Sequence, residues 1–424
     1  MDREKFIKEL STIVDTKNII SDSSRFQTYG FFREKIPKLV VVPQNKEEVQ
    51  AIVRSATKYE CPLYPVGGGT RINEVLISAS DGIGVCLAQM KNIIEFEPDN
   101  LSLVAEPGVT NPDLQQLVRP RNLFLPFYSD YSESTIGGEV ASNLNTRKRY
   151  RYGSAADCVL GVEFVSPRGD IVKTGGKTVK NVSGYDLNRL LAGSWGAIGL
   201  ITSVTVKLKP LPDEERVLLI GCDSYKRATD AAFKVLKNEL NIAALEILYP
   251  GKDWDIFDGC VDTVLLVSVE GSNTIVNDHA KKLIALLGDY EIKHVKGEDV
   301  ASFWDGHHIN RRQLSSKGSA LVKFDKRNIE DILSGFTGFR DDVTISDLDV
   351  VAGVLEFSCG PDCEELPKSI RDYWIQLQQK IKKGLMLSFA TIDRNLLLEK
   401  LMSNIDPHSI MFPANRLLGG VKNV

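Results

Sequence analysis

Three short glycine-bearing segments hold the residues of this sequence best suited to binding a phosphorylated cofactor. The first, PVGGGTR, follows an apolar run that predicts a strand. Consecutive glycines tolerate positive φ and let the backbone approach a ligand closely. Successive N–H groups in such a turn form a concave anion site suited to a pyrophosphate. Taken alone, a triple glycine is more often a plain loop, but the candidate ligand-binding residues here are Pro65, Gly67, Gly68, Gly69, Thr70 and Arg71.

The second and third segments repeat this pattern later in the chain. STIGGEVASN offers hydroxyls, a glycine pair and small residues against which a flat ring could lie, although a glycine turn leading into a helix is an equal alternative. Its candidate residues are Ser134, Thr135, Gly137, Gly138 and Asn143. The third segment runs from 177 to 208 and places Gly193, Gly196 and Gly199 before a β-branched strand. Three such segments in this order, each adjoining a strand, predict a binding site more strongly than any one of them.

None of these segments matches the common nucleotide-binding fingerprints. The sequence contains no G-x-G-x-x-G of the Rossmann type at these positions, and no Lys-Ser/Thr pair follows the triple glycine as a P-loop requires. We therefore do not expect this chain to use NAD directly.

A second polar cluster, FWDGHHINRR, lies at residues 303–312. Histidine titrates near neutrality, which suits a base that takes a proton from a hydroxyl group. The arginine fork is the side chain best suited to hold a carboxylate. His307 and His308 are thus candidate bases, and Arg311 and Arg312 are candidate carboxylate ligands. The alternative is a solvated helix surface.

The elements that must position these residues predict an α+β chain of two main domains. Strands are expected at 38–43, 61–66, 82–87, 101–106, 159–165 and 200–208, and again at 216–222, 262–270, 320–324 and 350–357. Asn45 is expected to cap a helix, with Glu48 three residues on. A second helix should begin at Asn111, and a last one should span about 393–404. The proline-bearing stretch 209–213 divides the chain into 35–212, 213–390 and a closing segment, 391–424.

Composition limits the class of protein further. The 424 residues are 43% hydrophobic and 25% charged with a formal net charge of −4, which excludes a disordered chain and disfavours a nucleic-acid binder. No apolar run is long enough to span a membrane, and the first ten residues carry no apolar signal core. Seven scattered cysteines favour a reducing cytoplasm and offer neither an iron–sulfur motif nor a metal site, and Cys359 and Cys363 are interpreted as structural.

The glycine segments together resemble a known family. PVGGGT, STIGGEVASN, YRYGSAAD and KNVSGYDLNRLLAGSWGAIGLIT are similar to the PCMH-type FAD-binding domain of the vanillyl-alcohol oxidase superfamily over roughly residues 35–212. The resemblance implies a two-part FAD-binding domain followed by a ferredoxin-like α+β cap that covers the flavin. The tail, LMSNIDPHSIMFPANRLLGG, resembles the closing segment of the family, which returns to the FAD-binding domain. It further implies that Gly67 to Thr70 hold the pyrophosphate, that Ser134 to Asn143 follow the ribityl chain and flavin, and that Ile201 lies near the adenine.

The resemblance also implies an activity and partners. The stretch KNVSGYDLNRLLAGS most resembles the E subunit of glycolate oxidase and FAD-linked 2-hydroxy-acid dehydrogenases such as those for D-lactate. A hetero-oligomer with a sister flavoprotein and an iron–sulfur protein is therefore expected, in the cytoplasm or held at a membrane through its partner. No histidine precedes His279, so the FAD should be noncovalent, and no metal is expected. The alternatives are a subunit that relays electrons or is only structural, and an NADPH-dependent reductase of the same superfamily.

Overall fold

Contacts within the chain define two compact units, of which unit 1 comprises 1–146, 153–211 and 390–424, and unit 2 comprises 147–152 and 212–389. The computed structural model describes residues 3–358 except 30, 32–35, 71–81, 128–130, 144–146, 177–185, 239, 249–256, 258–260, 262, 316–318, 325–328, 330–343 and 351–353. It also describes 385–388, 405–406 and 410–411. Arg71, the Cys359–Cys363 pair and the helix expected at 393–404 lie outside the described residues.

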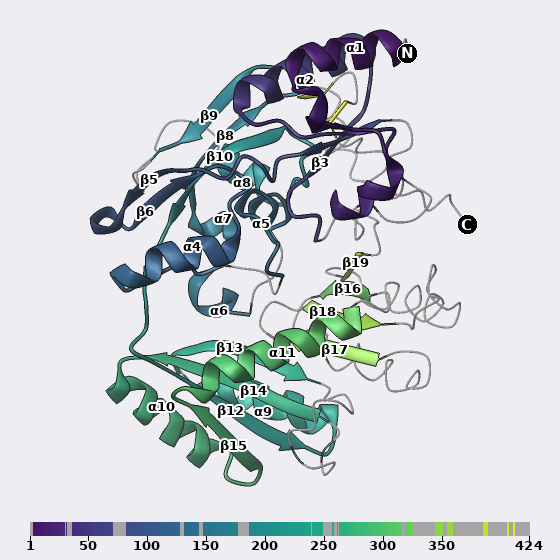
Figure 1. The fold of residues 1–424 in the computed structure, drawn as a ribbon. Helices are drawn as coiled ribbons and strands as arrows, with labels where there is room; N and C mark the ends of the chain where they lie inside the picture. The colour runs from purple at the N-terminus through teal and green to yellow at the C-terminus, as the bar shows by residue number, and fades with distance from the viewer. Residues whose placement is uncertain are drawn as a thin grey trace. The chain divides into compact units, whose positions relative to one another are not determined.

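Unit 1 begins with a four-stranded sheet in the order β1-β2-β4-β3, where β2 and β3 run parallel to β4 (Figure 1). The strands are β1 (Ile19–Ile20), β2 (Val40–Val41), β3 (Leu63–Val66) and β4 (Ile83–Cys86). Helices α1 (Arg3–Ile13) and α2 (Lys46–Tyr59) pack here through Phe6, Leu10, Val49, Ile52 and Val53. The predicted cap is confirmed, because Asn45 accepts a hydrogen bond from the Glu48 N–H.

A five-stranded antiparallel sheet completes the core of unit 1, in the order β5-β6-β10-β8-β9. Its strands are β5 (Ile93–Glu97), β6 (Ser102–Ala105), β8 (Val159–Val165), β9 (Ile171–Gly175) and β10 (Leu200–Lys207). The helices are α4 (Asn111–Val118), which begins where predicted, α5 (Ile136–Ser142), α7 (Ala155–Cys158) and α8 (Leu187–Leu191). Short 3-10 turns lie at Thr16–Asn18, Ser23–Tyr29, Pro98–Asn100 and Arg119–Arg121.

The end of the chain returns to unit 1, as expected. The Leu63 N–H donates to the Ile410 carbonyl oxygen at 2.7 Å, and Ile410 and Met411 are buried in the core between β3 and α2. Asp406 accepts from the Met411 N–H at 2.7 Å, which fixes this turn of the tail. A buried backbone group needs such a partner, so this short segment completes the edge of β3.

Unit 2 is built on one eight-stranded antiparallel sheet in the order β15-β12-β14-β13-β17-β18-β16-β19. The strands are β12 (Glu214–Cys222), β13 (Ile242–Leu248), β14 (Thr263–Gly271), β15 (Glu291–Lys296), β16 (Ser319–Phe324), β17 (Thr344–Asp349), β18 (Val354–Ser358) and β19 (Leu385–Ser388). The helices are α6 (Arg149–Tyr152), α9 (Tyr225–Lys237), α10 (Asn273–Leu286) and α11 (Asp299–Ser315).

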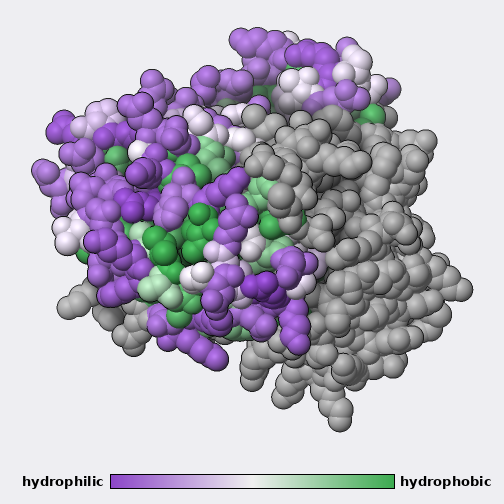
Figure 2. Space-filling view, turned by 90° about the horizontal axis from the view of Figure 1, so that it is seen from below, coloured by the Kyte–Doolittle hydropathy of each residue, from purple (hydrophilic) through white to green (hydrophobic). Residues whose placement is uncertain are grey.

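The two faces of this sheet have different coverings. The apolar faces of α9 and α10, including Ala228, Ala232, Val276 and Leu283, pack against Leu218 and other side chains of one face. Trp304 of α11 joins Val217, Leu219 and Leu266 on the opposite face. Side chains alternate along a strand, so consecutive residues of β12 serve both layers. On the side of the molecule that Figure 2 shows, most of the described residues are hydrophilic, and hydrophobic residues gather among them.

One predicted linker is ordered. Lys209 and Pro210 form β11 (Lys209–Pro210), which pairs with β7 (Leu123–Phe124). Proline is tolerated there because a two-stranded ladder leaves its nitrogen on the open edge. The boundary between the units follows directly, at residues 211 and 212.

Candidate cofactor-binding site

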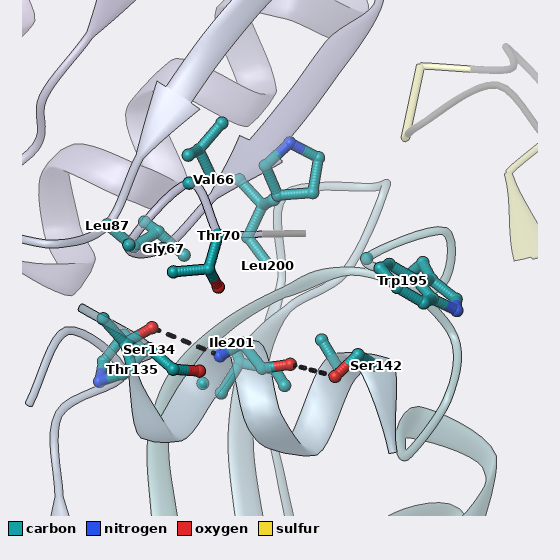
Figure 3. Close-up of a pocket in the computed structure, with 18 of the residues that line it drawn as sticks. Val66, Gly67, Thr70, Leu87, Ser134, Thr135, Ser142, Trp195, Leu200 and Ile201 are labelled. Atoms are coloured by element: carbon teal, nitrogen blue, oxygen red, sulfur yellow. Dashed lines mark hydrogen bonds between the residues drawn. The ribbon is translucent and has the colours of Figure 1, made fainter. Parts of the chain in front are cut away.

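The three glycine segments meet around one pocket of unit 1, with an empty volume of about 810 Å³ that includes space open to solvent. The β3–loop segment, the start of α5 and the turn before β10 all contribute to its wall (Figure 3). Eleven of the predicted residues line it, namely Pro65, Gly67, Gly68, Gly69, Thr70, Ser134, Thr135, Gly137, Gly138, Gly199 and Ile201. Asn143 lies at the end of α5, where its side-chain oxygen accepts from the Ala156 N–H at 3.1 Å, and it is not a lining residue.

The glycines of the pocket let protein segments approach one another. A Cβ on Gly68 would lie 1.7 Å from the Glu133 carbonyl oxygen, and one on Gly67 would lie 2.3 Å from the Thr135 Oγ1. Gly196, at φ +82°, would meet the Pro65 ring at 2.3 Å. These contacts join the first segment to the second and the third to the first. The glycines therefore allow the protein segments to pack closely and form the wall. From the sequence, we expected the glycines to let a ligand approach the backbone instead.

Hydroxyl groups give the wall its polarity. Ser134 Oγ donates to the buried Glu139 carboxylate at 2.7 Å, and Ser142 Oγ donates to the Gly138 carbonyl at 2.8 Å. Thr135 Oγ1 accepts from the Gly138 N–H at 3.4 Å, which caps α5 (Figure 3). The protons of Ser134 and Ser142 are thus engaged with the protein, so these hydroxyls present oxygen lone pairs to a ligand.

The pocket is otherwise apolar and uncharged. Its remaining described lining comprises Val66, Leu87, Pro107, Ala141, Ser142, Trp195, Gly196 and Leu200, and none of the described lining residues carries a formal charge. Apolar walls with a few convergent polar groups are typical of cofactor sites. The residues therefore fit a dinucleotide whose flat rings need apolar surfaces. Behind the loop, burial raises the pKa of the Cys86 thiol to about 11, which keeps it protonated at neutral pH.

A second concentration of polar side chains is buried inside unit 2. Glu215 of β12 and Glu270 of β14 are directly opposite each other in the sheet, and Lys148 lies between them. The Lys148 Nζ is 3.0 Å from Glu215 Oε2 and 2.6 Å from Glu270 Oε2. Tyr152 donates to Glu270 Oε1, and Arg151 donates to the Glu270 carbonyl at 2.7 Å. We call these five residues the lysine–glutamate cluster.

This cluster connects to α11 and to His307. Trp304 Nε1 donates to Glu215 Oε1 at 3.1 Å, and the Arg147 guanidinium lies 4.4 Å from the centroid of the Trp304 ring. His307 is 2% exposed, and its Nε2 is 3.3 Å from Glu246 Oε2. The backbone of α11 extends through His308, Arg311 and Arg312, whose side chains lie outside the described residues. For His307, the alternative of a solvated helix surface is wrong, because its ring is buried and faces a buried carboxylate.

Two pKa shifts follow from this packing. Burial alone would raise the pKa of Glu215, but Lys148 and hydrogen bonds from Ser268, Lys148 and Trp304 stabilise the carboxylate and lower it overall. Burial and the adjacent Glu270 charge raise the pKa of Tyr152 well above its ordinary value, so its phenol keeps its proton.

Sequence reasoning missed this cluster because its members are far apart in the chain. The available signal was a charged residue inside an otherwise apolar strand, such as Glu246 in IAALEIL and Glu270 in TVLLVSVEG. Among the residues described, no group of three or more His, Cys, Asp or Glu side chains is placed to hold a metal ion. No described helix is both long and apolar enough to cross a bilayer.

Comparison with known proteins agrees with the chemistry of the unit 1 pocket. Residues 37–175 match the family model of the FAD binding domain. This segment is therefore similar to the FAD binding domain of that family. The chain is 33% identical to the glycolate oxidase subunit GlcD of Bacillus subtilis over 216 residues, which are 51% of this chain and 46% of that protein.

Two further relatives are named as dehydrogenases of 2-hydroxy acids. The D-lactate dehydrogenase of Archaeoglobus fulgidus is 32% identical over 241 residues, 56% of this chain and 54% of the relative. The D-2-hydroxyglutarate dehydrogenase of Stutzerimonas stutzeri is 30% identical over 248 residues, 57% of this chain and 53% of the relative. The chain thus matches these relatives over about half of their length. The particular resemblance to the E subunit of glycolate oxidase stays a prediction.

Solved structures share the fold over nearly the whole chain. p-Cresol methylhydroxylase, solved with substrate bound, aligns with a TM-score of 0.77 at 16% identity, covering 100% of this chain and 98% of that one. Alkyldihydroxyacetonephosphate synthase aligns with a TM-score of 0.74 at 17% identity, covering 97% and 84%. The predicted α+β fold of the PCMH-type flavoenzymes is therefore confirmed.

Proposed function

We propose that this chain is an FAD-dependent oxidoreductase that converts a small 2-hydroxy acid, such as glycolate or D-lactate, to the 2-oxo acid. The observation that carries the proposal is the uncharged pocket that three separate glycine segments form in unit 1, where residues 37–175 match the FAD binding domain. The substrate class is supported by relatives named for glycolate, D-lactate and D-2-hydroxyglutarate.

The reaction divides the work between the cofactor and the protein. Bound FAD would supply the acceptor for the hydride that leaves C2 of the substrate. The hydroxyl proton passes to a base of the protein, and the C–O bond becomes a carbonyl. The pocket residues hold the cofactor in a fixed orientation, and the apolar lining of Val66, Leu87 and Leu200 excludes water from it. We assign noncovalent attachment because the sequence has no histidine before His279.

The base and the carboxylate ligand remain the residues that α11 carries. His307 is held by Glu246, which is the arrangement of an oriented base, but its burial equally fits a structural link between α11 and β13. His308 is the second candidate base, and Arg311 and Arg312 are the candidate carboxylate ligands. The His307→Gln substitution separates the two roles. If His307 is the base, the substitution should slow flavin reduction on the order of 10²-fold and leave stability unchanged. A structural link predicts lower stability instead.

The proposal is tested by anaerobic titration of the FAD-loaded protein. Glycolate, D-lactate or D-2-hydroxyglutarate should bleach the flavin absorbance, and the matched L-lactate serves as a stereochemical control. Bleaching by NADPH with none by the hydroxy acids would establish the reductase alternative. No bleaching by either would leave a relay or structural subunit.

We further propose that the chain functions in a complex that takes electrons from the reduced flavin. The sequence lacks the cysteine spacing of an iron–sulfur site or a c-type haem site, so the electrons of the reduced flavin leave this chain directly from the cofactor, and a partner protein is the acceptor that we propose. A relative named as a subunit of glycolate oxidase supports this assembly. A pull-down from the native source should recover a sister flavoprotein or a cysteine-rich iron–sulfur protein. Recovery as a monomer with fast turnover on a dye would contradict it.

A further inference from the structure

Trp195 has a backbone conformation that aromatic residues rarely adopt. Its φ is +53°, and it lies between Gly193 at φ +85° and Gly196 at φ +82°. The other described non-glycine residues with positive φ are the residues that cap the ends of helices, namely Glu60, Leu101, Asn122 and Asn143. Trp195 lies three residues beyond Ala192, the residue that caps α8. A left-handed bulky residue outside a cap is held there by its surroundings and points to a functional constraint.

Two neighbouring segments hold this conformation. The Trp195 N–H donates to the Ala141 carbonyl at 2.9 Å, and the Gly193 N–H donates to the Val140 carbonyl at 3.1 Å. Both acceptors lie near the C-terminal end of α5. Gly196 packs directly against Pro65, where a Cβ would lie 2.3 Å from the proline ring. The turn is thus anchored to the first and second glycine segments, and the direction of the indole ring is fixed with it.

The indole ring lines the pocket. Trp195 is half-buried and lies at the end of the pocket marked by Ser142, away from Val66 and Leu87 (Figure 3). The lining residues that α5 contributes at this end, Gly138, Ala141 and Ser142, are small, so their side chains leave room for a planar group. A planar ligand group in such a space gains a stacking contact with the indole.

We propose that the Trp195 indole is a binding surface for one of the two aromatic ring systems of the bound dinucleotide. The proposal rests on the assignment of FAD to this pocket. In this proposal, Trp195 contacts the cofactor and contributes to its affinity. The sequence analysis had identified only the glycines of this turn.

The test compares two substitutions that keep a non-glycine residue at the strained φ. Trp195→Phe retains an aromatic face, and Trp195→Leu retains apolar bulk without one. Stacking on a base is lost with the aromatic face, so FAD should bind on the order of 10-fold or more weakly to Trp195→Leu, and within about 3-fold of wild type to Trp195→Phe. Tyr59→Leu is the matched control, because Tyr59 is a half-buried aromatic residue of α2 that is not a lining residue of the pocket.

The readouts are the dissociation constant from flavin-fluorescence titration and the denaturation midpoint of the FAD-free protein. Titration with FMN and with ADP separates the two rings: weaker FMN binding to Trp195→Leu assigns the flavin, and weaker ADP binding assigns the adenine. Equal FAD affinity of wild type, Trp195→Leu and Trp195→Phe would overturn the proposal. The proposal would also be overturned if both variants bound FAD more weakly and both had a lowered denaturation midpoint, because that result indicates a loss of packing alone. If the wild-type protein binds no FAD, the assignment of FAD to this pocket is wrong. This result is distinct from the results that overturn the role of Trp195.

Discussion

The pocket of unit 1 and the lysine–glutamate cluster of unit 2 differ in the kind of side chain from which each is built. The pocket is lined by glycine, apolar side chains and hydroxyls, and its described lining has no formal charge. The cluster places two glutamates opposite each other in a sheet and balances them with Lys148. The pocket depends on close backbone contact, whereas the cluster depends on paired charge. Changes in shape should therefore damage the first, and changes in charge should damage the second.

The largest expected effect is the loss of the cation from the cluster. Lys148→Met leaves Glu215 and Glu270 buried without their ammonium group. Breaking a buried ion pair on one side costs about 3–5 kcal/mol, and we expect that loss in the free energy of unfolding measured by urea denaturation. Lys58→Met is the matched control, since Lys58 pairs with Glu9 on the surface with 61% of its side chain exposed, and should leave stability essentially unchanged. Equal effects of the two substitutions would show that charge balance is not what stabilises unit 2.

A smaller loss of stability, with a specific loss of cofactor, is expected from a shape change in the pocket. Gly68→Ala puts a Cβ 1.7 Å from the Glu133 carbonyl oxygen, so the first loop must move away from the second segment. Overpacking of this kind costs about 1–3 kcal/mol, and FAD content after purification should fall to a small fraction of wild type. Gly176→Ala is the control, because no atom of the described residues lies within 4 Å of a Cβ there. Full FAD content in Gly68→Ala would contradict the role of close packing.

The pH dependence of stability should sharpen the same contrast. The pKa of Glu215 is lowered on folding, so its carboxylate stabilises the protein above its unfolded value of about 4.3. That contribution disappears as the pH falls through the folded pKa. The free energy of unfolding should therefore drop more steeply in this acid range for wild type than for Glu215→Gln. Parallel curves for the two proteins would mean that Glu215 does not titrate as the geometry implies.

The sequence allowed prediction of the pocket but not of the cluster, for a physical reason. Each glycine segment is contiguous in the sequence, so Gly67, Gly68 and Gly137 could be identified without knowing the fold, although the close contacts that require glycine there involve segments distant in the chain. Lys148 and Glu270 meet only because a short segment of the chain leaves unit 1 and packs in unit 2, and no local pattern encodes that pairing. The register of β12 against β14, which brings Glu215 opposite Glu270, is likewise a property of the assembled sheet.

Several strands were predicted close to their observed bounds. β8, β10, β12 and β14 lie within a residue or two of their expected bounds, because each is a long apolar run. β5 and β9 were not anticipated, and none of their residues is buried. Exposed strands depend on their neighbours for pairing, and their sequences carry a weaker signal.

The central claim is that unit 1 holds FAD without a covalent bond, and the absorbance spectrum before and after acid denaturation tests it most directly. The purified protein, reconstituted with FAD if necessary, should be yellow and carry about one flavin per chain. After acid precipitation, the flavin should remain in the supernatant and be identified as FAD by chromatography. A colourless protein that takes up no FAD would contradict the account, and flavin that stays with the precipitate would contradict noncovalent binding.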